Sequence, residues 1–123
     1  MASVPLREVC GVRSGDKGDI SDLTLFADDD EMYDLLLREI TVERVRGHFG
    51  AFVTGPIERF EARNVLAVKF VLYGALDGGG PRSLRSDNLG KTLGAALLRL
   101  PIEVPDAVLA RSVRNGRRAP LDR

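Results

Sequence analysis

Residues 11–19, which read GVRSGDKGD, place two cationic and two acidic side chains among three glycines. Glycines let the backbone turn with positive φ and let a ligand come close to main-chain N–H groups. Arg13 and Lys17 are suited to hold a carboxylate or a phosphate. Asp16 and Asp19 are suited to fix those cations or to bind a donor. An anion-binding loop is therefore one interpretation, and a connection whose charges pair with each other in water is the other.

A second glycine-bearing stretch, residues 76–91, reads LDGGGPRSLRSDNLGK. A glycine-rich turn before a helix N-terminus is suited to anions, because unsatisfied N–H groups and the positive end of the helix dipole point outward. Asp87 would cap that helix, and Lys91 would lie one turn inside it. A flexible loop with a solvated helix start is the alternative. We predict that the two stretches together form one polar site, which holds an anionic ligand or seats an acidic segment of a partner.

The residues that we assign to anion binding are cations, glycines and short polar side chains. Lys69 is among them because it interrupts an apolar strand, where an unpaired ammonium is costly to bury. A solvated strand face is the other interpretation of Lys69. The set is Arg13, Ser14, Gly15, Gly18, Lys69, Gly78, Gly79, Arg82, Ser83, Arg85, Asp87 and Lys91.

Four strands and three helices are expected to position these residues. β-forming runs predict strands at 6–12, 20–27, 56–63 and 66–76. Apolar stripes predict helices at 28–40, 41–49 and 87–100. Thr41 is predicted to cap the second helix and Gly50 to end it, and Pro101 is predicted to close the third. This order predicts an α+β domain, in which two antiparallel hairpins form a sheet with helices packed on one face. We expect that domain to span residues 1–105 and the arginine-rich tail, 106–123, to be mobile.

The strand at 66–76 is largely apolar on both of its faces. Val68, Phe70 and Leu72 alternate with Ala67, Val71 and Tyr73. One interpretation is that a subunit or partner covers the second face of the sheet. The other is a central strand that is buried within the monomer.

Composition excludes several classes of function. Lys+Arg of 18 balance Asp+Glu of 18, so we expect no field that attracts nucleic acid or anionic lipid. The single cysteine and single histidine give no repeated ligand spacing, so no metal is expected. No apolar run is long enough to span a bilayer, and no signal peptide is evident, so we expect a cytoplasmic protein without a membrane partner. RNA binding through the basic tail is a minor alternative.

The blocks RSGDKGD, LAVKFVLYGALDGGGPRSLRSDNLGK and IEVP, taken in order, resemble the small AtuA-like domain. That domain forms the C-terminal part of the acyclic terpene utilisation protein AtuA and also occurs as a separate chain. The resemblance covers about residues 9–105 and implies a ferredoxin-like fold. It also implies a partner, a larger AtuA-type subunit, and a place in bacterial catabolism of branched acyl-CoA compounds. The chain departs from the family at Lys69, where an asparagine is usual.

The resemblance implies a hydratase or dehydratase, a lyase that acts on an acyl-CoA or a related anionic acyl substrate. This chain would be its small subunit in a homo- or hetero-oligomer, with the cationic site at the interface and no cofactor other than CoA within the substrate. Asp16 or Asp19 would carry the proton if burial raised the pKa of its carboxyl, and Lys17 would assist. The alternative is a non-catalytic subunit that stabilises a larger partner.

Overall fold

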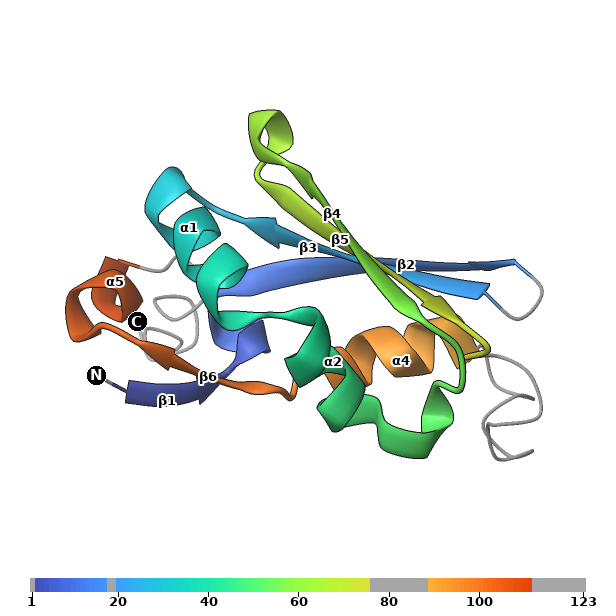
Figure 1. Cartoon of the computed structure of the whole chain (residues 1–123). Helices are drawn as coiled ribbons and strands as arrows, with labels where there is room; N and C mark the ends of the chain where they lie inside the picture. The colour runs from blue at the N-terminus through green and yellow to red at the C-terminus, as the bar shows by residue number, and fades with distance from the viewer. Residues whose placement is uncertain (1, 18–19, 76–88, 112–123) are drawn as a thin grey trace.

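The computed structural model describes residues 2–17, 20–75 and 89–111 (Figure 1). The strands are β1 (Ala2–Pro5), β2 (Cys10–Lys17), β3 (Ile20–Ala27), β4 (Ile57–Ala62), β5 (Ala67–Tyr73) and β6 (Pro101–Val104). The α-helices are α1 (Asp30–Glu39), α2 (Val42–Phe49), α4 (Leu89–Leu97) and α5 (Asp106–Arg111). Single 3-10 turns lie at Leu6–Glu8, Gly50–Phe52 and Arg63–Val65. In this part of the chain, no helix is long and apolar enough to cross a membrane.

Four strands form one antiparallel sheet in the order β2-β3-β5-β4. The two predicted hairpins, β2–β3 and β4–β5, are both present. Strand β5 lies between β3 and β4, which are therefore parallel to each other and are connected through α1 and α2 in a split βαβ arrangement. Strand β6 follows α4 but stays outside this sheet, because it pairs with β1 in a separate two-stranded ribbon.

Local sequence signals account for the two helices that follow β3. The carboxylate of Asp29 accepts a hydrogen bond from the Met32 N–H at 2.8 Å and so caps α1. The hydroxyl of Thr41 caps α2 by accepting from the Arg44 N–H at 3.1 Å. Helix α2 ends at Gly50, whose φ of 57° suits a glycine. The sequence predicts both helices and the Thr41 cap, and the structure confirms them.

The core lies between the sheet and helices α1, α2 and α4, which pack on one face (Figure 1). Burial alternates strictly along β3, where every second side chain points at the helices. Each large apolar side chain that is fully buried stabilises the fold by about 1.5–3 kcal/mol relative to an exposed one. The sheet residues of this kind are Leu23, Leu25, Val68, Phe70 and Leu72. The predicted α+β fold, with helices on one face of two hairpins, is therefore confirmed.

The predicted strand at 6–12 is wrong in its position. Leu6–Glu8 form a 3-10 turn, because the N–H groups of Leu6 and Arg7 donate to the carbonyls of Leu100 and Leu98 instead of to a neighbouring strand. The strand proper starts at Cys10 and continues to Lys17, through most of the stretch that was expected to be a loop. The reason is non-local: residues 10–17 pair with β3 along their whole length.

The C-terminal region also differs from expectation. Helix α4 ends at Leu97, and Pro101 opens β6 instead of merely closing the helix. The first six residues of the expected tail form α5. Residues 112–123 lie outside the described part of the chain, so the mobility of the remaining tail stays a prediction.

Candidate functional site: the cleft between β2 and α4

A cleft with a volume of about 500 Å³ lies between the edge strand β2 and helix α4. Its walls are apolar side chains, backbone and the hydroxyl of Ser14. The lining residues are Val12, Arg13 and Ser14 from β2 and Gly94, Ala95 and Leu98 from α4. Three residues of the first glycine-bearing stretch thus meet the helix that begins in the second.

Gly94 determines how closely α4 approaches β2. A Cβ atom at this position would lie 3.3 Å from the Ser14 Oγ and 3.8 Å from the Val12 Cγ1. Even a methyl group would therefore press on the strand. The absence of a side chain at Gly94 lets the helix backbone lie against Ser14, and it keeps the floor of the cleft clear.

Helix α4 runs antiparallel to β2. The carbonyl of Leu98, just beyond the end of the helix, accepts from the Arg7 N–H at 3.0 Å, before β2 begins. One turn earlier, Gly94 lies beside Ser14, in the middle of the strand. The N-terminal end of α4 is therefore directed toward the Lys17 end of β2. The partial positive charge of a helix N-terminus is consequently directed to the same end of the molecule as the β2–β3 turn.

The end of β5 lies at this same end of the sheet. Lys17 pairs with Ile20, and Ile20 pairs in turn with Tyr73, the last residue of β5. Gly74 then turns the chain with a φ of 72°, and its carbonyl accepts from the Thr54 hydroxyl at 3.2 Å. The chain thus leaves the sheet beside Ile20, just before the second stretch, and α4 begins within that stretch at Leu89.

Apart from Lys69, the predicted site residues divide into three groups. Arg13, Ser14 and Gly15 lie on β2, and the first two line the cleft. The backbone of Asp16 and Lys17 belongs to β2 and that of Lys91 to α4, but their side chains are not described. The remaining ones lie outside the described residues, so their roles stay predictions: Gly18, Asp19, Gly78, Gly79, Arg82, Ser83, Arg85 and Asp87.

Polar contacts next to the cleft stabilise the β2–β3 hairpin. The hydroxyl of Ser21, which is fully buried, donates to the Gly15 carbonyl at 3.3 Å. On the other face, a Cβ at Gly15 would lie 3.3 Å from the Asp22 carboxylate. Gly15 therefore leaves space for the carboxylate of Asp22.

Lys69 lies away from the helix-facing side of the sheet. Arg13 pairs with Thr24, and Thr24 pairs with Lys69, so the three form one row across β2, β3 and β5. Thr24 alternates with buried residues of β3, which places this row on the face that has no helix. The Lys69 side chain is exposed, as the solvated-face interpretation expected. The structure does not bring it together with Ser14 and α4.

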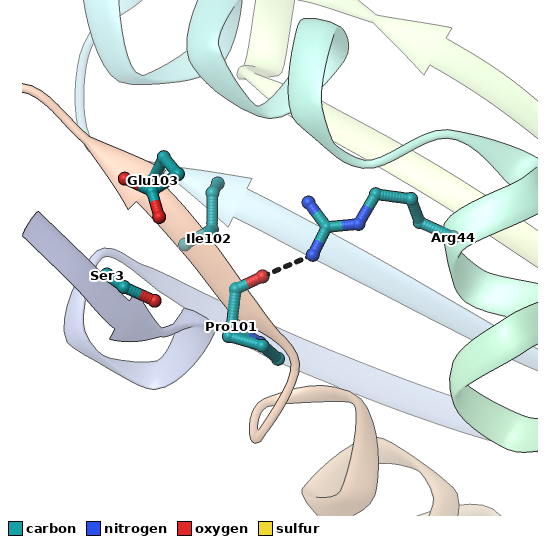
Figure 2. Close-up of a pocket in the computed structure, with 5 residues that line it drawn as sticks. All are labelled: Ser3, Arg44, Pro101, Ile102 and Glu103. Carbon is teal, nitrogen blue, oxygen red and sulfur yellow. Dashed lines mark hydrogen bonds between the residues drawn. The ribbon is translucent and has the colours of Figure 1, made fainter.

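A second hollow, of about 150 Å³, has an arginine but is not suited to anions (Figure 2). The Arg44 guanidinium donates to the carbonyl of Pro101 on β6 and to that of Glu39. It also lies 3.6 Å from the Glu39 carboxylate, and Glu103 lines the hollow as well. Arg44 is therefore already engaged by protein acceptors, and it connects α2 to the β1–β6 ribbon.

The single histidine and the single cysteine have structural positions. The Nε2 of His48 lies 2.6 Å from the Ala96 carbonyl, so it donates and ties α2 to α4. The thiol of Cys10 is buried and contacts the Leu6 carbonyl at 3.6 Å. Neither side chain lines the cleft.

The described part of the cleft is suited to bind more than to react, since Ser14 is the polar side chain on the helix side of β2, while strand alternation places the Arg13 side chain on the face that has no helix. Sequence reasoning missed Gly94, Ala95 and Leu98. Gly94 and Leu98 are four residues apart and follow the core positions Leu93 and Leu97 by one residue, so they lie on the flank of the apolar stripe. That spacing could have indicated them.

A family model, the AtuA ferredoxin-like domain, matches residues 4–103. No curated protein and no solved structure gives a significant match. The matched region runs from β1 to β6 and includes the whole four-stranded sheet, the cleft and both glycine-bearing stretches. The chain belongs to the family of AtuA ferredoxin-like domains.

Proposed function

We propose that this chain is the small subunit of a two-component AtuA-type enzyme that hydrates or dehydrates an acyl-CoA or a related anionic acyl substrate. In this proposal, residues 11–19 and 78–91 form a cationic site where the larger subunit docks. Family membership supports the pairing with a larger AtuA-type chain.

The observation that carries the proposal is the antiparallel packing of α4 on β2. It directs the start of α4, the β2–β3 turn and the end of β5 to one end of the molecule. Two segments that are about 60 residues apart in the sequence therefore leave the folded core close together. A ligand held between them would meet main-chain donors from both.

The chemistry requires a base and a set of donors. Removal of a proton next to a thioester carbonyl leaves an enolate, whose negative charge fixed donors must stabilise. Arg13, Lys17, Arg82 and Lys91 would supply positive charge toward the acyl-CoA or the partner. Asp16 or Asp19 would exchange the proton, with the larger subunit excluding water from the site.

The test is co-expression with a larger AtuA-type chain, followed by affinity purification and an assay with unsaturated acyl-CoA thioesters. We expect a stable complex with hydratase activity. The double variant Lys17→Ala/Arg82→Ala should lower kcat/KM at least about tenfold, since it removes two charge-assisted contacts. Full activity of that variant would argue against the proposal. Arg38→Ala, an exposed arginine on α1, is the matched control and should have no effect.

A second candidate function is a non-catalytic subunit whose site grips the larger partner. The apolar lining of the cleft favours it, because Val12, Ala95 and Leu98 suit a partner side chain better than a charged reaction centre. In that case Asp16→Asn and Asp19→Asn would leave kcat unchanged, whereas Arg82→Ala would dissociate the complex. Measuring kcat and subunit affinity on the same variants separates the two functions.

A further inference from the structure

The face of the sheet that points away from the helices is uncovered among the described residues (Figure 1). Its side chains alternate with the core positions of each strand, and most are half-buried or exposed. Phe60, on β4, is 51% exposed. An antiparallel sheet can expose one face to water, but contiguous apolar side chains on such a face indicate a contact surface. Phe60 adjoins the row that Ala62, Ala67 and Phe26 form across β4, β5 and β3.

The charged residues of this face are distributed in a regular order. Among the side chains that are described, each strand contributes one charge to the face. Across the sheet these are Arg13 on β2, Asp22 on β3, Lys69 on β5 and Glu58 on β4. Arg13 and Lys69 lie in one row, and Asp22 and Glu58 lie in the next row along the strands. The order is basic, acidic, basic, acidic.

When this order of charges is laid against the same order reversed, every basic strand lies opposite an acidic strand. A two-fold axis parallel to the strands, midway between β3 and β5, would place β2 over β4 of a second copy and β3 over β5. Each basic strand would then face an acidic one, with an offset of two residues that long Arg and Lys side chains can bridge. An isologous interface requires a surface of this self-complementary kind. We therefore propose that the open face of the sheet binds a second copy of this chain.

The apolar residues of the face also fit this arrangement. Phe26 and Ala67 are partners across β3 and β5, so the axis would place each Phe26 over the small Ala67 of the other copy. Phe60 shares its row with Arg13, so the exposed ring would lie under the guanidinium of the second copy. The interface would thus combine aromatic burial with four cross-copy charge contacts.

The dimensions of the face indicate a weak dimer. Four strands about 4.8 Å apart and seven residues at about 3.4 Å each cover roughly 19 by 24 Å, or roughly 450 Å² on each copy. The total of roughly 900 Å² is below the roughly 1,000 Å² of a stable specific interface and falls in the range of weak, transient contacts. Association should therefore depend on protein concentration and on salt.

Sedimentation equilibrium of the full chain tests the proposal, over about 5 to about 500 µM because a small interface implies weak association. We expect the average mass to rise from 13.4 kDa towards twice that value, and the rise to weaken at high salt. Lys69→Glu should raise the dimer dissociation constant at least about tenfold, by creating like-charge contacts. Glu43→Lys, an equally large charge change on the exposed side of α2, should leave it unchanged.

The double variant Asp22→Lys/Lys69→Glu provides the rescue. It changes the order of charges across the strands to basic, basic, acidic, acidic. Laid against its reverse, this order again places each basic strand opposite an acidic one, so dimerisation should return. If this variant fails to fold by circular dichroism, Phe60→Asp replaces it, since an exposed side chain is not needed for the core, and it should abolish the dimer. A monomer at every concentration, or a dimer that Lys69→Glu and Phe60→Asp leave intact, would overturn the proposal.

Discussion

The two faces of the four-stranded sheet are formed by the same strands but differ in chemistry. The helix-facing side carries the apolar core, whose central side chains are fully buried, and Arg59 on β4 donates from this side to the carbonyls of Leu37 and Ile40. The opposite side alternates apolar and charged residues, and Arg13, Lys69 and Glu58 are exposed there. Alternation along each strand produces this difference, because successive side chains point to opposite faces.

The difference indicates which face maintains the fold and which is available for recognition. Substitutions on the helix-facing side remove core packing and must lower stability. Substitutions on the open face remove contacts with water or with another chain, so they should leave stability nearly unchanged. The cleft lies at the boundary, since β2 is the edge strand where the helix layer begins.

The largest expected effect is that of truncating a core phenylalanine. Phe70→Ala should lower the free energy of unfolding by about 3–5 kcal/mol, because it leaves a cavity between the sheet and the helices. Phe60→Ala removes the same atoms from the open face and should cost less than about 1 kcal/mol. Urea denaturation of both variants measures the contrast. Equal losses would show that the open face is covered in the folded chain.

A pair of glycine substitutions tests how tightly α4 packs at the boundary. Gly47→Ala on α2 meets no atom within 4 Å, so the gain in helix propensity should stabilise the fold by about 0.5–1 kcal/mol. Gly94→Ala has the same propensity gain but presses on Ser14, so it should be less favourable than Gly47→Ala by about 1 kcal/mol. Thermal unfolding of both variants decides this. Equal stabilisation would mean that α4 does not lie against β2.

The smallest expected effect is a change in the pKa of Tyr73, on the open face. Tyr73 donates to the Glu58 carboxylate at 3.0 Å, and this hydrogen bond, helped by burial and by the negative charge, raises the pKa of Tyr73 above its usual value. The pKa of Tyr73 is higher in the folded state than in the unfolded chain. The stabilisation from this hydrogen bond is therefore complete below the ordinary pKa of tyrosine, and it is lost as the pH rises through the raised folded-state pKa.

Glu58→Gln should therefore lower the pKa of Tyr73 towards that of a free tyrosine. An NMR titration of the tyrosine ring carbon measures this shift. Asp34→Asn, which removes an exposed carboxylate from helix α1, is the control and should leave the Tyr73 titration in place. An unchanged pKa in Glu58→Gln would contradict the described contact.

Local signals made much of the fold predictable. The cap at Thr41, the stop at Gly50 and the apolar stripes of α1, α2 and α4 depend on neighbours within one or two turns, and sequence reasoning found them. The extension of β2 to Lys17 depends on pairing with β3, and the β1–β6 ribbon joins residues about 100 positions apart. Such pairings have no local signature.

The candidate site was predictable only in part, because its strand side has local signals in the sequence whereas its helix side depends on packing between distant segments. Glycines and cations mark Arg13, Ser14 and Gly15 as unusual, and the structure places them at the cleft or beside it. The helix side of the cleft consists of Gly94, Ala95 and Leu98, which have no chemical signature and matter only because α4 packs there. Lys69 was grouped with this site by residue type, but strand register places it on the open face.

The central claim is that the two glycine-bearing stretches act as one site for negative charge. A titration of the isotope-labelled full chain with free coenzyme A, followed through backbone amide NMR shifts, tests it directly. We expect amides within residues 13–20 and 74–94 to shift together, to give one dissociation constant, and to respond less as salt is raised. Shifts confined to one segment, two different constants, or no response would contradict the claim.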